Sequence, residues 1–340
     1  MSELKLLEET LDELFARELK YDADPAAMWQ RLEEAGLTLA GVSEEAGGGG
    51  GGLDEAALVV RVAGRHAAPG PIAETGLLAG WLLAAAGLAV PEGPLTAAAG
   101  DSLTLRRDGD GWLLDGAARR VPWARAVEWI AVLAGGQVAL VPVERATLSL
   151  STNLAGEPRD TVAFDRVRID AAQVGAVAGG IDAEAFECRG ALARAAAIAG
   201  ALERVLELTV RYAGEREQFG RPIGRFQAVQ HEIALLAGEV VAARAAVDAA
   251  IERPDPLHVA SAKIRTGEAA TRATEIAHQV PGALGFTQEY RLHRFTLRLW
   301  AWRDEFGSEE QWARTLGEQV AAGGGDELWP LLTATERERE

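Results

Sequence analysis

Apolar residues near the start of the chain recur at the three- and four-residue spacing of amphipathic helices. The first stripe comprises Leu4, Leu7, Leu11, Leu14 and Phe15, and the second comprises Met28, Trp29, Leu32 and Ala35. Such stripes bury one face of a helix against a core. The pattern resumes over residues 53–62, and the apolar segment 76–90 has the length of a buried helix, not of a membrane span. Residues 1–92 are therefore predicted to form an N-terminal helical domain.

The pattern changes between residues 93 and 175 to short alternating or β-branched runs with turn signals between them. Leu103 and Leu105 alternate with polar neighbours, and the Asp-Gly-Asp-Gly sequence of residues 108–111 predicts a hairpin turn. Gly135 and Gly136 separate two further apolar runs, residues 129–133 and 138–143, which predict a second hairpin. This part of the chain is predicted to be a small central β domain.

After Gly180 the helical spacing returns over much longer stretches. One stripe comprises Leu192, Ala195, Ala199, Leu202, Leu206 and Val210, and another comprises Val229, Ile233, Leu236, Val240, Ala243 and Val247. Pro254 and Pro256 end the second helix, residues 258–279 predict a third, and Ser308 with Gln311 predicts the capping box of the last. Residues 176–340 are predicted to form a four-helix bundle. The expected fold class is mainly α with an inserted β domain.

The composition limits the classes of partner. The 340 residues carry a formal net charge of −17, which opposes general attraction to nucleic acid, and no segment requires a membrane. The single cysteine, Cys188, excludes an internal disulfide, and no signal peptide is recognisable, so a cytoplasmic location is expected. The six glycines of residues 47–52 lack the Lys-Ser pair of a phosphate-binding loop and are interpreted as a plain flexible loop. No histidine spacing predicts a metal site.

The segment 216–230 carries the most specific chemical pattern. It contains Arg216-x-x-Phe219-Gly220-x-Pro222, followed by Phe226-Gln227-x-x-Gln230. A charged turn with a fixed Phe-Gly-x-Pro sequence, leading into a glutamine-rich helix start, is not explained by packing alone. An arginine there can form two parallel hydrogen bonds with phosphate oxygens, and an amide can both donate and accept.

These motifs and their order along the chain resemble the acyl-CoA dehydrogenase family of flavoenzymes. The resemblance covers nearly the whole chain. Its motifs are Glu45-Ala46-Gly47-Gly48 and the segment 69–75 near the start, Ala163-Phe164-Asp165 in the β region, the segment 216–230, and His278-Gln279 followed by residues 280–286 in the bundle. The resemblance implies a helical domain, a β domain and a four-helix bundle, with FAD as cofactor and an acyl-CoA as substrate.

The resemblance also implies which residues bind FAD. In this family the bundle of one subunit reaches the FAD of its neighbour. By resemblance, Arg216 pairs with the pyrophosphate, Gln227 hydrogen-bonds nearby and Phe219 packs beside the flavin. Gln279 and the turn at Gly282 hold the adenosine half.

The expected catalytic base is less well matched. The family's reaction removes an α proton with a glutamate while a hydride passes from the β carbon to the flavin. Counting from the Gly285-Phe286 motif, the base position falls on Phe306, and Glu305 lies one residue early. Glu305 is therefore the first catalytic candidate. Glu252 and Asp255, near the end of the second bundle helix, remain alternatives.

Two further positions depart from the family pattern. The β domain has Arg119-Arg120-Val121-Pro122 where relatives have an aromatic and a hydroxyl residue against the flavin, and proline offers no N–H. Glu187, Arg189 and Arg194 lie near the expected CoA-binding positions but out of register.

The residues that serve a neighbour's FAD are therefore kept, whereas those that serve the chain's own flavin are altered. The first hypothesis is a non-catalytic subunit of an α2β2 acyl-CoA dehydrogenase acting on a bulky, steroid side-chain acyl-CoA. A self-sufficient homo-oligomeric enzyme and a flavin-free structural protein on the same scaffold are the alternatives.

Overall fold

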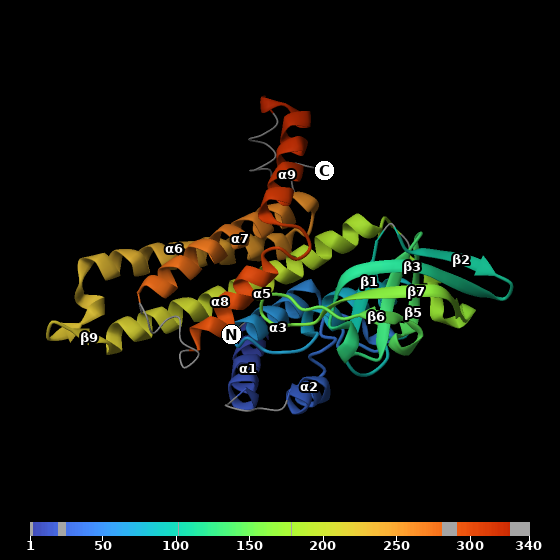
Figure 1. The fold of residues 1–340 in the computed structure, drawn as a ribbon, viewed down its shortest axis with the longest axis horizontal. Coiled ribbons are helices and arrows are strands. Elements are labelled where there is room, and N and C mark those ends of the chain that lie inside the picture. Colours follow the sequence, from blue (N-terminus) through green and yellow to red (C-terminus); the bar gives the residue numbers. More distant parts are fainter. Residues whose placement is uncertain (1–2, 20–24, 101, 178, 281–290, 327–340) are drawn as a thin grey trace.

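Helix α5 (Ala183–Glu215) is the axis around which the helical parts of the molecule pack, as the computed structural model shows (Figure 1). The structure describes residues 3–19, 25–100, 102–177, 179–280 and 291–326. Residues 191–202 of α5 are buried without interruption, most of them alanine. A helix that is apolar all round is stable only when neighbours cover it on every side. The N-terminal helices and the rest of the bundle provide that cover.

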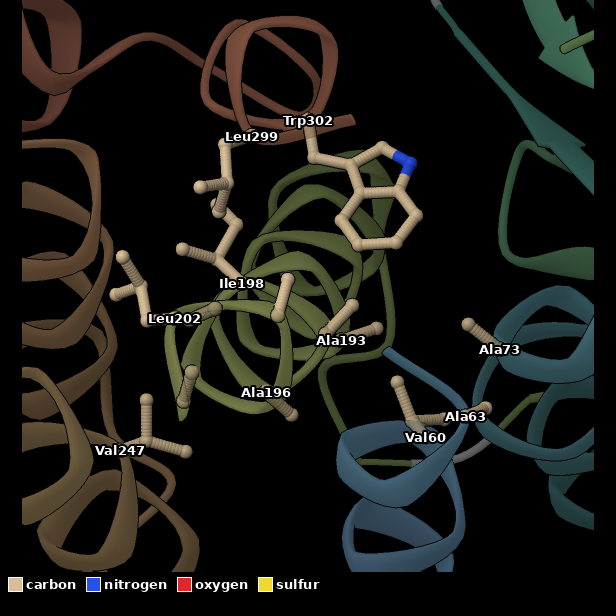
Figure 2. Close-up of a cluster of buried hydrophobic side chains, with 14 of the residues drawn as sticks. Val60, Ala63, Ala73, Ala193, Ala196, Ile198, Leu202, Val247, Leu299 and Trp302 are labelled. Carbon is tan, nitrogen blue, oxygen red and sulfur yellow. The ribbon is translucent and has the colours of Figure 1, made fainter. Parts of the chain in front are cut away.

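The N-terminal helices pack against one side of α5. They are α1 (Glu3–Glu18), α2 (Pro25–Glu34), α3 (Leu53–Arg65), a π-helical segment (Glu74–Gly80) and α4 (Trp81–Ala85). Glycines allow α3 and α5 to approach until their backbones touch, because a Cβ on Gly64 would lie 2.2 Å from the Ala197 carbonyl oxygen and one on Gly200 1.8 Å from the Arg61 oxygen. Figure 2 shows the resulting contact, with Val60 and Ala63 facing Ala196.

The glycine run of residues 47–52 is not the plain flexible loop expected from its composition. The amides of residues 48–51 donate hydrogen bonds of 2.8–3.0 Å to carbonyls of residues 39–43. A Cβ on Gly48 would lie 2.2 Å from the Val42 carbonyl oxygen. Side chains are therefore excluded by close backbone packing, and the segment is a compact turn.

The β domain is a sandwich of two four-stranded sheets. Its strands are β1 (Leu95–Ala99), β2 (Thr104–Asp108), β3 (Gly111–Pro122), β4 (Trp129–Ala134), β5 (Gln137–Pro142), β6 (Thr147–Ser149), β7 (Arg159–Ile169) and β8 (Val174–Ala176). One sheet has the order β1-β4-β5-β8 and the other β2-β3-β7-β6. Both predicted hairpins are present, as β2–β3 and β4–β5.

Each face of the first sheet is covered by a different part of the chain. Ile130, Val132 and Val141 face the second sheet and form the sandwich core with residues such as Val162. On the other face, Leu133 packs with residues of the π-helical segment and α4. The β domain is therefore held against the N-terminal helices by a shared apolar layer.

The C-terminal helices complete the bundle. After α5 come a short hairpin of β9 (Glu217–Gln218) and β10 (Arg221–Pro222), then α6 (Gln227–Glu252), α7 (Pro256–Gln279), α8 (Leu292–Trp302) and α9 (Glu309–Gly323). Asp255 caps α7 by accepting a hydrogen bond from the His258 amide, and Ser308 with Gln311 forms the predicted capping box of α9. Helix α9 projects away from the other helices (Figure 1).

The predicted fold class is confirmed: helices, a β domain and a helical C-terminal part follow in that order. The described part of the C-terminal region has one helix more than the four predicted, because α8 and α9 are separate. The domain limits at residues 92 and 175 stay predictions; the flanking elements end at Ala85 and begin at Leu95, and β8 ends at Ala176. Within the described residues, no helix is long and apolar enough to span a membrane.

Candidate active site

A cavity of about 630 Å³ lies where the β domain, the start of α5 and the turn after α8 meet. Its β-domain wall consists of residues 97–100, at the end of β1, and residues 118–122 of β3. Its other walls come from residues 151–154, from Phe186 and Glu187 on α5, and from the turn of residues 304–307. The cavity is large enough for a ring system or an acyl group, and Glu305 forms part of its floor.

Glu305 is held by four hydrogen bonds from three donors. Its Oε1 accepts from Arg159 Nε at 2.7 Å and from Asn153 Nδ2 at 2.9 Å. Its Oε2 accepts from Arg194 Nε at 2.6 Å and from Arg159 Nη2 at 2.9 Å. The side chain is only 12% exposed. Its carboxylate is therefore fully engaged by donors from the β domain and from α5.

The same arginines continue the network to two more buried carboxylates. Arg194 donates to Glu74 at 2.5 Å, and Arg159 Nη2 donates to Glu157 at 3.0 Å. Glu157 also accepts from Trp302 Nε1 at 2.9 Å. These groups come from the N-terminal, β and C-terminal parts of the chain, so the network joins all three at the base of the cavity.

The electrostatics of Glu305 do not match those of a general base. Burial alone raises the pKa of Glu305, but the charges of Arg194 and Arg159 and the hydrogen bonds from Arg159 and Asn153 outweigh it and lower the pKa to about 2. A base that works at neutral pH needs a pKa near 7 and a free lone pair. In this geometry Glu305 acts as the centre of an ion-pair network, and its predicted catalytic role stays a prediction.

The alternative bases have structural explanations as well. Asp255 accepts the His258 amide as the cap of α7, and its pKa is lowered because the hydrogen bonds from His258 outweigh burial. Glu252 is the last residue of α6. Neither residue lines the cavity.

Phe306 is the residue at which counting from the Gly285-Phe286 motif predicts the base. It has a positive φ of 52°, and its ring lies against α5, packing edge-on to Phe186 at a centroid distance of 6.0 Å. A Cβ on Gly190 would lie 2.2 Å from this ring, so α5 has no side chain at the point of contact. The phenylalanine is therefore built into the wall by its neighbours.

The β-domain wall presents cations where a flavin ring would need an aromatic or a donor. Arg119 and Arg120 are exposed to the cavity, and the ladder between β3 and β7 is irregular there, with Arg120 at a φ of 54°. Pro122 has no N–H to donate, and its carbonyl accepts from Thr96 Oγ1 at 2.6 Å. The residues of this wall do not fit an isoalloxazine ring in the way that the family pattern requires.

Lys263 fixes the turn that carries Glu305. This lysine is 0% exposed, and its Nζ donates to the Arg303 carbonyl at 2.5 Å, with the Trp302 carbonyl at 3.5 Å. These carbonyls end α8 and have no partner within the helix. Lys263 thus caps α8 from α7 and sets the direction in which the chain enters the cavity floor.

Lys263→Met is expected to remove a rise in stability that the wild-type chain shows with increasing pH. Burial lowers the pKa of Lys263 from 10.5 to about 8, although Glu305, Asp304 and Glu309 raise it. Between these two pH values the unfolded chain binds more protons than the folded chain, so stability increases as pH rises. The difference between the two pKa values corresponds to about 3 kcal/mol in the free energy of unfolding.

The measurement is urea unfolding of both proteins between pH 7 and pH 10.5. Lys5→Met, on the exposed face of α1, is the control and should keep the wild-type slope. If the free energy of unfolding rose equally with pH in the wild type and in Lys263→Met, Lys263 would not be the source of the pH dependence.

Three of the predicted FAD-binding residues lie together at the β9–β10 hairpin. Arg216 is the C-cap of α5, Phe219 is at the tip of the hairpin, and Gln227 begins α6. Phe219 is 93% exposed, with a φ of 53°, and its ring packs only edge-on against Phe226. Arg216 and Gln227 are exposed too, and within the described residues no ion pair holds Arg216. All three side chains are available to a ligand.

Gln279 lies at the same end of the bundle as this hairpin. It is the last residue of α7, which runs antiparallel to α6 after a connection of three residues, and it is exposed. Gly282, the fifth predicted cofactor residue, lies outside the described residues. The four described residues thus gather at the end of the bundle marked by β9 in Figure 1.

This end of the bundle is far from the cavity in the same chain. Phe186 lines the cavity near the start of α5, and Arg216 follows its end thirty residues later. At 1.5 Å per residue the two positions are about 45 Å apart. The hairpin residues therefore cannot contact a ligand bound in the cavity of their own chain.

The residues that sequence analysis missed are those that hold Glu305. Arg159, Asn153 and Glu74 lie between 146 and 231 positions before it in the chain, and no spacing rule connects them. Arg194 had one visible signal, because a single arginine interrupts the alanine run of residues 191–201. A charge in a stripe that must be buried requires a partner.

Comparisons with known proteins agree over most of the chain. Residues 188–321 match the family model for the acyl-CoA dehydrogenase C-terminal domain. The acyl-CoA dehydrogenase IpdE2 of Mycobacterium tuberculosis is 31% identical over 314 residues, which cover 87% of this chain and 90% of that protein. The crystal structure of the ChsE4–ChsE5 complex from Mycobacterium tuberculosis has a TM-score of 0.83 at 24% identity, with 94% of this chain and 98% of that chain covered. The Tcur3481–Tcur3483 steroid ACAD has a TM-score of 0.83 at 25% identity and the same coverage.

Proposed function

This chain belongs to the acyl-CoA dehydrogenase family, and from that membership we propose that it is the non-catalytic subunit of a hetero-oligomeric acyl-CoA dehydrogenase. The enzyme family is FAD-dependent. In the proposed assembly a related subunit supplies the base and the flavin ring pocket. This chain supplies the residues that hold the far part of the partner's FAD.

The separation along α5 is the observation that carries the proposal. Arg216, Phe219 and Gln227 are exposed at one end of the bundle, about 45 Å from the cavity. A guanidinium, an aromatic ring and an amide suit a pyrophosphate and a stacked ring system. These residues are too far from the cavity to hold a dinucleotide bound there, so we assign them to a dinucleotide that another subunit carries.

The state of the cavity supports a non-catalytic role. FAD would supply the hydride acceptor of the reaction, but Arg119, Arg120 and Pro122 are poorly suited to hold its ring. Glu305 has both carboxylate oxygens occupied by arginines and a pKa of about 2. The β-domain wall and Glu305 therefore do not match the ring-binding wall and the free base that the reaction needs, which supports the proposed non-catalytic role.

The outer face of α6 supports an assembly. Val241 is 67% exposed and Leu235 38% exposed. The other exposed residues around them are small, namely Ala234, Gly238, Ala242 and Ala245. A helix that is apolar on its outer face as well as its inner face is normally covered by a further element. The partner we propose for it is a related acyl-CoA dehydrogenase subunit, and the support is that the similar ChsE4–ChsE5 structure is a complex.

We further propose a bulky, steroid-derived acyl-CoA as the substrate of the assembly. The support is the similarity to the Tcur3481–Tcur3483 steroid ACAD over 94% of this chain. This part of the proposal is tested by turnover of the assembled enzyme with steroid side-chain and short-chain acyl-CoA thioesters. Equal or greater turnover of the short-chain thioester would contradict it.

Flavin stoichiometry tests the proposed function. The chain purified alone is expected to be colourless, and a tagged chain co-expressed with a related full-length subunit is expected to retain one FAD per pair. Absorbance at flavin wavelengths, compared with protein concentration, gives the ratio. A chain that is yellow when purified alone, and whose flavin is reduced by an acyl-CoA, would disprove the non-catalytic assignment.

A further inference from the structure

A second, smaller cavity is lined by an unusual concentration of positive charge. It has a volume of about 140 Å³ and lies between α1, α5 and the start of α8. Arg204 and Arg211 line it from α5, and the N-cap residue Arg291 and Arg294 line it from the start of α8, with His66 beside them. We propose that this cavity is an anion site that binds a phosphate or a phosphoryl group. The inference is independent of the function proposed above.

Arg294 is the clearest case of a cation without a counter-ion among the residues that the structure describes. Burial lowers the pKa of Arg294, and the charges of Arg298 and Arg291 lower it further. Across the described residues its guanidinium has no carboxylate partner, and neither has that of Arg211. A half-buried cation without a counter-ion is costly in a folded protein. A bound anion would remove this cost.

The acidic residues near the cavity are already engaged. Glu207 pairs with Arg204 at 2.8 Å and with Arg65 at 2.5 Å. Asp12 pairs with the His66 ring at 2.8 Å. These pairs leave the charges of Arg211 and Arg294 uncompensated by the described carboxylates.

The start of α8 adds to the positive potential. Arg291 is the N-cap of α8, its side chain makes no capping hydrogen bond, and the first turn of the helix contains no acidic residue. Helix N-termini carry partial positive charge and normally attract acidic side chains. Two arginines at this helix start therefore reinforce the potential of α5, in a chain whose net charge is −17.

The shape of the cavity favours a compact anion. Its remaining walls are apolar and come from Phe15, Leu19, Leu208 and Phe295. A volume of about 140 Å³ accommodates a tetrahedral oxyanion with water but not a whole nucleotide. Guanidinium groups suit phosphate oxygens because each can donate two parallel hydrogen bonds. A nucleotide would insert only its terminal phosphoryl group.

Thermal unfolding and calorimetric titration of the full chain with inorganic phosphate test the proposal. In phosphate-free chloride buffer, added phosphate should raise the Tm saturably, whereas sodium chloride at equal ionic strength should not. Arg294→Gln should weaken phosphate binding at least tenfold. Arg168→Gln removes the same charge from an exposed side chain on β7 and should bind phosphate like the wild type. A phosphate response no larger than that of chloride, or one unchanged in Arg294→Gln, would overturn the proposal.

Further measurements keep the test decisive. Arg294→Gln should fold in chloride buffer because it relieves repulsion between arginines, and Arg211→Gln, at an exposed position, gives a second variant with the same expected loss. The anion could be free phosphate or the phosphoryl group of a nucleotide, and titration with ADP and coenzyme A separates these two sources. Tighter binding than that of inorganic phosphate identifies a nucleotide, and equal or weaker binding identifies free phosphate. If the co-expressed assembly lost FAD in the Arg294→Gln variant, the cavity would be part of the FAD site. That result would overturn the proposal of a separate phosphate site.

Discussion

Replacing Arg194 by methionine is expected to lower the free energy of unfolding by about 3–5 kcal/mol at pH 7, since removing one partner of a buried ion pair leaves an uncompensated charge. Arg194 is 4% exposed and holds Glu74 at 2.5 Å and Glu305 at 2.6 Å. Methionine fills much of the volume but donates nothing, so two buried carboxylates lose a donor. Urea unfolding at pH 7 measures the loss.

A matched control lies on the same helix. Arg189 is largely buried, but within the described part of the chain its hydrogen bond goes to the Leu77 carbonyl, at 3.3 Å, and its guanidinium lies over the Trp81 ring. Burial lowers its pKa to about 10. Because Arg189→Met leaves no carboxylate without its partner, it should cost less than about 1 kcal/mol. Similar losses for both variants would show that side-chain packing, and not charge, accounts for the effect.

The pH dependence of the Arg194→Met loss follows from Glu305. The pKa of Glu305 in the folded chain is about 2, against an ordinary value of 4.5. Its contribution of about 3 kcal/mol is therefore present above pH 4.5 and disappears as pH falls towards 2. The difference in unfolding free energy between the wild type and Arg194→Met should decrease over the same pH range. A difference that is constant from pH 7 to pH 3 would contradict the role given to Glu305.

Arg216→Ala is expected to weaken FAD binding by the co-expressed assembly about 10- to 100-fold. Charged hydrogen bonds contribute about 1.5–3 kcal/mol, and each 1.4 kcal/mol changes a dissociation constant tenfold. Arg216 is exposed, so its loss should leave the fold intact. Flavin content after gel filtration, and the FAD dissociation constant from flavin fluorescence, give the result.

Arg225→Ala is the control for this experiment. Arg225 is also exposed and lies nine residues further along, between the hairpin and α6. The Arg225→Ala substitution removes the same charge from the same end of the bundle as Arg216→Ala. If both variants lost FAD equally, a general loss of positive potential would explain the result; unchanged flavin in Arg216→Ala would refute its assignment to the pyrophosphate.

Local patterns were sufficient for most of the fold. The Asp-Gly-Asp-Gly sequence of residues 108–111 predicts the β2–β3 turn because glycine tolerates the positive φ that the turn requires, 63° at Gly109. The capping box of Ser308 and Gln311 predicts the start of α9 because both groups bond within one turn. Such features depend on neighbours three or four residues away.

The glycine run and the ion-pair network show where local patterns fail. Composition indicates a flexible loop for residues 47–52, but the contact of Gly48 with Val42 depends on how the chain folds back. Glu305 looks like an acidic residue beside a helix, and the surroundings that lower its pKa come from Arg159 and Arg194. No periodicity links residues more than a hundred positions apart.

The sequence by itself determined the family, the order of helical and β parts, and the candidate FAD residues around Arg216, because these rest on short motifs and on the periods of helices and strands. Only the tertiary structure decided what the candidates face. It placed Arg216 about 45 Å from the cavity along α5 and surrounded Glu305 with arginines from distant segments. The physical reason is that pKa and ligand access depend on burial and on charges brought together by folding, which residue spacing along the chain does not record.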